Sequence, residues 1–232
     1  MAIPSIFAMT GGEIFRCPSL PAKIAWMGCH FSTDDTGLSG LPTDLPPGSL
    51  LVIDDATPIA EHDPKRIIDQ LLPVISGNRI DGILMDLQRP ATQQAKKMAT
   101  ALVQAMACPV AQPPVYAHGL DCPVFVPPIP PYIPASEYLK PWQHRRVWLE
   151  LALDASVITL TDVGCSIKYV PVASPATSPQ HDTELHCHYS TAVQDDAIRF
   201  YLYRTAEDVA ALLDAIPDTC VSCAIGLFQE LG

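Results

Sequence analysis

The sequence predicts a compact α/β fold, a TIM-like (β/α)8 barrel formed as a single domain over residues 1–232. Two observations predict it. About eight short apolar runs recur along the chain, and most are continuous rather than alternating, which is typical of parallel strands covered by helices. Helical patterns separate several of these runs, as in β/α repeats. The chain has 232 residues, fewer than the roughly 250 usual for this barrel, so shortened or missing helices are expected in its middle.

The first half of the chain shows the repeat most clearly. Two strands are followed by a helix that Asp63 would cap, and then by a third strand and a second helix. These elements are expected over residues 23–31, 49–55, 63–76, 80–88 and 92–106. The strand over 80–88, IDGILMDLQ, is therefore counted as the third of the barrel.

The second half departs from a regular repeat. Short strands are expected at 108–117, 122–129 and 146–154, with no good helix between residues 108 and 145. Two β-hairpin insertions are predicted at 156–172 and 186–203, and the run 197–203 is also counted among the barrel strands. A helix over 205–216 leads to a final strand at 223–229.

Proline is unusually frequent, with 24 residues, roughly twice the average. Many prolines follow the ends of predicted strands, where they stop a ladder by removing a hydrogen-bond donor. In a barrel, the loops that begin there form the C-terminal face, which carries the site. The sequence thus predicts proline-rich, rigid loops around the site.

The charge balance excludes several classes of partner. The formal net charge is −11 with 14 Lys and Arg residues, and the one basic cluster is residues 144–146. We therefore expect no nucleic-acid partner and no membrane association. The chain begins without a basic, apolar leader, and its eight cysteines are scattered through apolar segments as in reduced proteins. An acidic cytoplasmic protein is the expectation, and the oligomeric state is left open.

The segment 81–88, DGILMDLQ, ends an apolar run with polar residues on one face. It resembles the fourth-strand signature D-G-x-D-x-D-x-E of family 18 glycoside hydrolases, the chitinase-like barrels. Asp81, Gly82 and Asp86 match, while Leu84 replaces the middle aspartate and Gln88 replaces the catalytic glutamate.

The end of the chain carries a second resemblance to that family. An eighth strand there ends in a sequence similar to W-E-L-G, and this chain closes with Gln229 in the tryptophan's place, followed by the matching residues Glu230, Leu231 and Gly232. The two matches cover about a fifth of the chain.

The resemblance implies a site in which Asp86 and Gln88 stand where a hydrolytic pair would be. In the family, the glutamate protonates the leaving oxygen and the neighbouring aspartate positions the substrate's acetamido group. Glutamine cannot deliver a proton at neutral pH, so an acid contribution of roughly 10²–10⁴-fold would be missing. The predicted function is binding of a small-molecule or oligosaccharide ligand, an amino sugar, with weak or no hydrolysis. Whether the protein is an enzyme stays open.

Other strand-end carboxylates could supply the missing acid. Glu150, Ala152 and Asp154 share one face of a strand, and an acidic residue inside a strand costs energy unless it is paired or solvated. Glu150 is therefore a third catalytic candidate, unless Arg89 or Arg204 pairs with it. An alternative function is a hydrolase of another class that uses Asp86, Glu150 and Glu230, with or without a metal. A further alternative is a structural or interaction barrel without catalysis.

The remaining candidates bind ligand rather than react with it. They lie at strand ends or near the proline-rich loops, and they are His30, Asp54, Tyr116, His188, Gln229 and Glu230. His30 could also join His186 and His188 as metal ligands. Because no further ligands at metal spacing are evident, neither a metal nor a cofactor is predicted.

Overall fold

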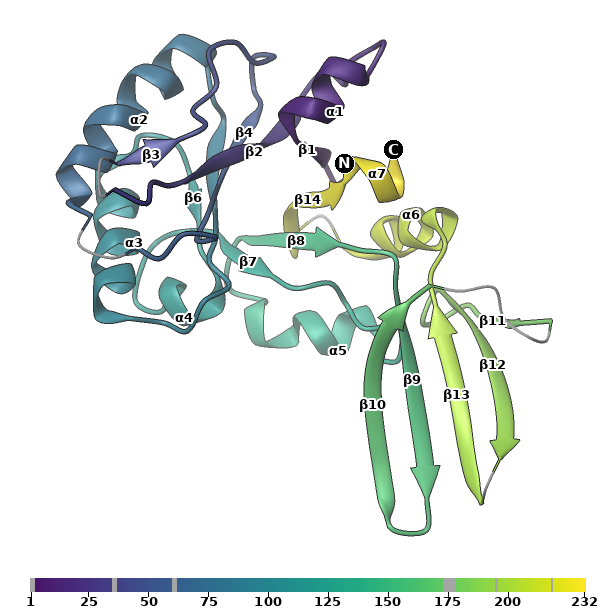
Figure 1. Ribbon diagram of the computed structural model, residues 1–232. Helices are drawn as coiled ribbons and strands as arrows, with labels where there is room; N and C mark the ends of the chain where they lie inside the picture. Colours follow the sequence, from purple (N-terminus) through teal and green to yellow (C-terminus); the bar gives the residue numbers. More distant parts are fainter. Residues whose placement is uncertain (1–2, 35–36, 60–61, 173–177, 195, 218) are drawn as a thin grey trace.

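The computed structural model describes residues 3–34, 37–59, 62–172, 178–194, 196–217 and 219–232. Eight parallel strands form a nearly closed barrel, and a five-stranded antiparallel sheet extends away from it (Figure 1). The fold class is therefore the predicted one, a TIM-like barrel with β-hairpin insertions. Within the described residues, no helix is long and apolar enough to cross a membrane.

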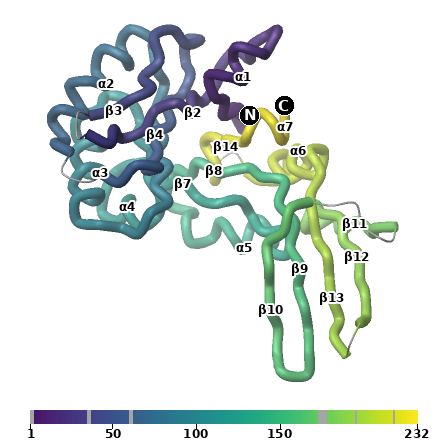
Figure 2. Tube along the Cα trace, in the orientation of Figure 1, coloured from purple at the N-terminus to yellow at the C-terminus, as the bar shows by residue number. Residues whose placement is uncertain are grey.

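The barrel strands follow one another around the sheet in chain order. They are β1 (Ser5–Met9), β2 (Ile24–Phe31), β4 (Leu50–Asp54), β5 (Gly82–Asp86), β6 (Val110–Ala111), β7 (Val124–Val126), β8 (Val147–Leu151) and β14 (Val221–Leu227). A two-residue strand, β3 (Leu38–Ser39), pairs antiparallel with β2. Because β1 also pairs with β14, the two ends of the chain lie near each other (Figure 2).

The gap between β6 and β7 is bridged by the residue that follows β6. Gln112 forms an isolated parallel bridge with Val124. Its N–H donates to the carbonyl of Pro123 at 3.0 Å, and its own carbonyl accepts from the N–H of Phe125 at 2.8 Å. These two bonds bring the last pair of strands together at one point only.

The numbering of the strands corrects the sequence analysis. β1 precedes the run at 23–31, so β5, which carries GILMD, is the fourth barrel strand and not the third. The run 197–203 is not a barrel strand but part of the second sheet. In that run Ile198, Phe200 and Leu202 alternate with polar or aromatic residues, a period of two that suits a sheet without covering helices.

Helices are long early in the chain and short in its middle. The set is α1 (Gly11–Arg16), α2 (Pro64–Asn78), α3 (Gln93–Ala105), α4 (Pro114–Ala117), α5 (Ala135–Leu139), the 3₁₀ turn η1 (Lys140–Trp142), α6 (Ala206–Ala215) and α7 (Phe228–Leu231). Asp63 and Thr92 cap α2 and α3 by accepting backbone N–H groups. The reduced α4 and α5 occupy the stretch where no helix was expected, and each begins at or directly after a proline.

Both predicted hairpins are present and join into one sheet between β8 and α6. Its strands are β9 (Asp154–Thr161), β10 (Gly164–Pro171), β11 (Gln180–Asp182), β12 (Cys187–Gln194) and β13 (Ala197–Tyr203), arranged β10-β9-β13-β12-β11. We call it the inserted sheet. Arg204 fixes its base to the barrel, because the guanidinium donates to the carbonyls of Leu185 and His186 and to those of Ile129 and Pro130 in the loop after β7.

The barrel interior is an apolar cluster built by alternate residues of the strands. Its buried members are Ile6, Ala8, Ala25, Leu50, Val52, Leu84, Ala111, Phe125, Trp148, Cys223 and Ile225. Residues between them face outward, as Leu51 and Ile83 do, and pack with α2 and α3 in a second cluster. Alternation therefore decides which strand-end side chains reach the barrel mouth.

Candidate functional site

Two carboxylates point into the C-terminal mouth of the barrel. Leu84 on β5 and Trp148 on β8 face the interior, so Asp86 and Glu150, each two residues further on, face it as well. Both line a cavity of about 50 Å³ whose other walls include Phe125. Asp86 and Glu150 are far apart in the sequence, and they meet because the fourth and seventh strands of the barrel line the same cavity.

Gln88 lies just beyond β5 and is bonded to Asp86. Its amide Nε2 donates to Asp86 Oδ1 at 2.9 Å. The buried carboxylate of Asp55 fixes the backbone there, since Oδ1 accepts from the N–H of Gln88 and Oδ2 from that of Arg89, each at 2.9 Å. The polar residues at the end of DGILMDLQ thus form an ordered pair, held by a carboxylate from the neighbouring strand end.

The electrostatics of the mouth favour protonated acids. The pKa of Glu150 is raised to about 7, first by burial and then by the nearby carboxylates of Asp86, Asp154 and Glu230. Burial also raises the pKa of Asp86, and the charge of Asp54 adds to it, while the hydrogen bond from Gln88 opposes the shift. Glu150 can therefore hold a proton near neutral pH and still release it.

Neither arginine considered as a partner for Glu150 pairs with it. Arg89 donates to the backbone carbonyls of Asp55 and Ala56, at 2.6 and 2.7 Å. Arg204 donates to the backbone carbonyls that fix the inserted sheet. Neither guanidinium therefore offsets the effect of burial and of the neighbouring carboxylates, which together raise the pKa of Glu150.

Two of the predicted ligand-binding residues lie beside Asp86. In the parallel register, His30 on β2 is level with Asp54 on β4, and Asp54 is level with Asp86. Cys29 and Phe31 belong to the outer core, so His30 faces the other side of its strand. Asp54 Oδ1 accepts the N–H of Ala56 at 2.9 Å. His30, Asp54 and Asp86 therefore form a row across three strand ends.

The other predicted residues do not join this row. Tyr116 is 5% exposed and packs in the core outside the barrel. Gln229 and Glu230 belong to α7 rather than to the last strand, which ends at Leu227. Glu230 Oε2 accepts the N–H of Leu153 at 3.2 Å and so remains near the mouth.

His188 belongs to a different cluster. It pairs with Asp208 at 2.9 Å, and His30, His186 and His188 do not converge. Among the described residues, the ligand atoms that do converge are those of His181, His188 and Asp208.

A groove runs along the rim beside Glu150. It has a volume of about 280 Å³ and is lined by Pro127, Pro128, Ile129, Pro130, Pro131, Ala152, Asp154, Tyr169 and Arg204. The hydroxyls of Tyr132 and Tyr169 lie 3.1 Å apart. The proline-rich loop after β7 and the inserted sheet therefore both line this groove, the loop with prolines and Ile129 and the sheet with Asp154 and Tyr169.

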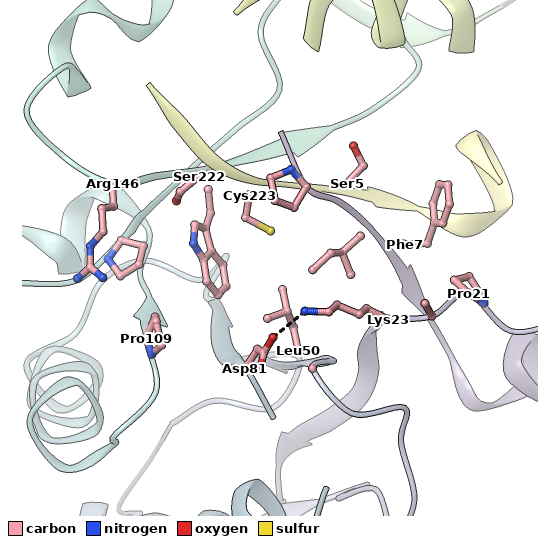
Figure 3. Close-up of a pocket in the computed structure, with 16 residues that line it drawn as sticks. Ser5, Phe7, Pro21, Lys23, Leu50, Asp81, Pro109, Arg146, Ser222 and Cys223 are labelled. Carbon is pink, nitrogen blue, oxygen red and sulfur yellow. Dashed lines mark hydrogen bonds and ion pairs between the residues drawn. The ribbon is translucent and has the colours of Figure 1, made fainter. Parts of the chain in front are cut away.

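A larger cavity of about 540 Å³ lies at the opposite, N-terminal end of the barrel (Figure 3). Lys23 and Asp81 form an ion pair of 2.8 Å there, and Arg146 and Trp148 also line it. Asp81 of the signature is thus separated from Asp86 by the length of the strand. We place the candidate site at the C-terminal mouth, because the carboxylates with raised pKa values gather there.

Sequence comparison identifies no relative, since no protein-family model and no curated protein sequence matches the chain. Comparison with solved structures does find similar folds. The spore cortex-lytic enzyme SleL from Bacillus cereus aligns with a TM-score of 0.59 at 11% identity, over 99% of this chain and 71% of SleL. SleL from Bacillus megaterium QM B1551 aligns with a TM-score of 0.53 at 12% identity, over 97% of this chain and 71% of SleL.

A third similar structure matches over nearly its full length. It is the C-terminal domain of a chitinase candidate from Desulfitobacterium hafniense DCB-2, with a TM-score of 0.57 at 12% identity, over 100% of this chain and 95% of that domain. At such low identities the similarity concerns the fold alone. The chain therefore shares its barrel fold with proteins described as a cortex-lytic enzyme and a chitinase.

Proposed function

We propose that the C-terminal mouth of the barrel binds an amino-sugar oligosaccharide and hydrolyses it weakly or not at all. The observation that carries this proposal is the hydrogen bond between Gln88 and Asp86 at the end of the fourth strand. The corrected strand number supports the proposal, because β5 is the fourth barrel strand and the family 18 signature, which has an acid where Gln88 stands, lies on the fourth strand. The barrel fold shared with the chitinase candidate supports the same class of ligand.

The dimensions of the mouth favour binding across it rather than inside it. A cavity of about 50 Å³, with Met27, Phe125 and Leu227 among its walls, holds a few water molecules at most. A sugar ring would therefore lie over the mouth, with neighbouring rings in the adjoining groove. Tyr169 and the prolines there offer apolar surface for ring faces.

The chemistry explains why binding would not lead to efficient cleavage. The Gln88 amide has no acidic proton, so it can orient Asp86 but cannot protonate a leaving oxygen. Asp86 keeps its place because it accepts the amide N–H at 2.9 Å. The site would thus retain Asp86, which corresponds to the aspartate that positions the substrate in family 18, and would lack the catalytic acid.

Calorimetric titration with N-acetylglucosamine oligomers tests the proposal, with hydrolysis assayed in parallel. The wild type and Gln88→Glu should both bind, and cleavage should rise roughly 10²-fold or more in the variant. Gln143→Glu, at an exposed position in the segment after η1, is the matched control and should change neither property. Absence of binding by the wild type and by Gln88→Glu would overturn the proposal and favour the structural or interaction barrel.

A second candidate function is a hydrolase whose acid is Glu150. The raised pKa of about 7 favours this role, since the neutral acid is present near pH 7. Its proton would go to the leaving oxygen as the glycosidic or other scissile bond breaks, while water supplies the remaining hydroxyl. If the wild type cleaves a substrate and Glu150→Gln does not, this candidate replaces the binding-only one.

A further inference from the structure

Asp208 is held between two histidines that come from a different part of the fold. Asp208 lies in the first turn of α6, and its side chain is 7% exposed. His181 on β11 and His188 on β12 are direct cross-strand partners, so their rings project from the same face of the inserted sheet. The ring centroids are 4.9 Å apart. The two histidines of one hairpin therefore meet an aspartate that lies 27 and 20 residues further along the chain.

Each carboxylate oxygen has a different set of partners. Oδ2 accepts from His188 Nδ1 at 2.9 Å and from the backbone N–H and the hydroxyl of Thr205, at 2.9 and 3.0 Å. Oδ1 lies 2.9 Å from His181 Nε2, within hydrogen-bond distance. The capping box thus fixes the carboxylate through Oδ2, which also contacts His188, while Oδ1 contacts His181.

This set of atoms has the composition and spacing of a transition-metal site. Two imidazole nitrogens and one carboxylate oxygen are common protein ligands of Zn²⁺ and of related divalent ions. Here the three ligand atoms lie within 4.8 Å of one another. A tetrahedral ion with bonds of about 2.0–2.1 Å needs its ligand atoms about 3.3 Å apart. Small side-chain rotations would bring the present contacts to that spacing.

We propose that His181 Nε2, His188 Nδ1 and Asp208 Oδ1 bind one divalent transition-metal ion, with Zn²⁺ the best match. Each imidazole would bind through the nitrogen that now contacts Asp208, and its proton would move to the other ring nitrogen. His188 is already oriented by stacking on Tyr203, with centroids 5.4 Å apart and planes inclined by 21°. Water would complete the coordination, because the His181 side chain is 39% exposed.

The ion would have a structural role and would not take part in the candidate site at the mouth. None of the three ligands lines the mouth cavity. They join the β11–β12 hairpin of the inserted sheet to α6, the helix that leads back into the last barrel strand. Metal binding would therefore fix the inserted sheet relative to the barrel, and metal removal would loosen it.

Titration of the metal-free full chain with ZnCl₂ tests the site. The wild type should bind one ion per chain and show a higher Tm with Zn²⁺. His181→Gln and Asp208→Asn should weaken binding by more than roughly 100-fold, since each loses a ligand. Asp208→Asn keeps an oxygen for the cap, so its fold is preserved. His186→Asn, in the same hairpin, is the matched control and should bind normally, because asparagine tolerates the φ of 46° found there.

Cobalt distinguishes this site from adventitious binding by the cysteines, and it does so without any variant. Wild-type protein loaded with CoCl₂ should show d–d absorption of a nitrogen and oxygen site and no sulfur-to-metal charge-transfer band. A charge-transfer band, no binding of Zn²⁺ by the wild type, or undiminished binding by both ligand variants would overturn the proposal.

Discussion

Glu150 should make the stability of the protein depend on pH between about 4.5 and 7. Its pKa is about 7 in the folded protein against 4.5 as the ordinary value, chiefly through burial. The folded state therefore holds this proton more tightly than the unfolded chain does. Below pH 4.5 both states are protonated and Glu150 carries no penalty. As the pH rises to 7 and above, ionisation in the buried mouth lowers the free energy of unfolding by about 3 kcal/mol, at 1.36 kcal/mol per pH unit.

Replacement of Glu150 by Gln removes this term while it keeps the size of the side chain. We expect Glu150→Gln and the wild type to be similar in stability at pH 4, and the variant to be more stable by about 3 kcal/mol at pH 8. Urea denaturation at intervals across this range measures the difference, and the exposed Glu184→Gln serves as control. A difference between variant and wild type that does not change with pH would refute the reasoning, because it would mean that Glu150 ionises as easily in the fold as in the unfolded chain.

Three further substitutions test other contacts. Arg204→Met should lower the free energy of unfolding by about 3 kcal/mol, because four buried or partly buried carbonyls lose their donor; urea denaturation measures it, and the exposed Arg199→Met should cost far less. Gln112→Met should stabilise the fold by about 1–3 kcal/mol, since the Gln112 side chain is fully buried and neither its Nε2 nor its Oε1 has a hydrogen-bond partner among the described residues; a lower Tm would contradict this. Asp55→Asn should speed hydrogen exchange at the backbone N–H of Gln88, which now donates to Asp55 Oδ1 at 2.9 Å. Unchanged exchange would exclude a positioning role for Asp55.

The pattern of residues along the chain was sufficient for the fold class and for the two hairpins. Continuous apolar runs separated by helical segments are a local signal, and each can be read without knowledge of the rest of the chain. The strand order was less accessible, because β1 is a five-residue strand without a following long helix. A second strand, 197–203, has the composition of a barrel strand and pairs instead with β9 and β12. Composition does not specify a pairing partner, which is why the strand over 197–203 was assigned to the barrel and not to the inserted sheet.

The sequence by itself determined that Asp86 and Gln88 share one face at a strand end, because the period of two in a strand is a local property. Only the tertiary structure decided that Glu150 faces Asp86 across the mouth, that Tyr116 is buried in the outer core, and that His181 and His188 meet Asp208. These outcomes depend on which distant segments pack together. A pKa or a ligand cluster follows from the residues that surround a group in space, and those neighbours come from strands and helices far apart in the chain.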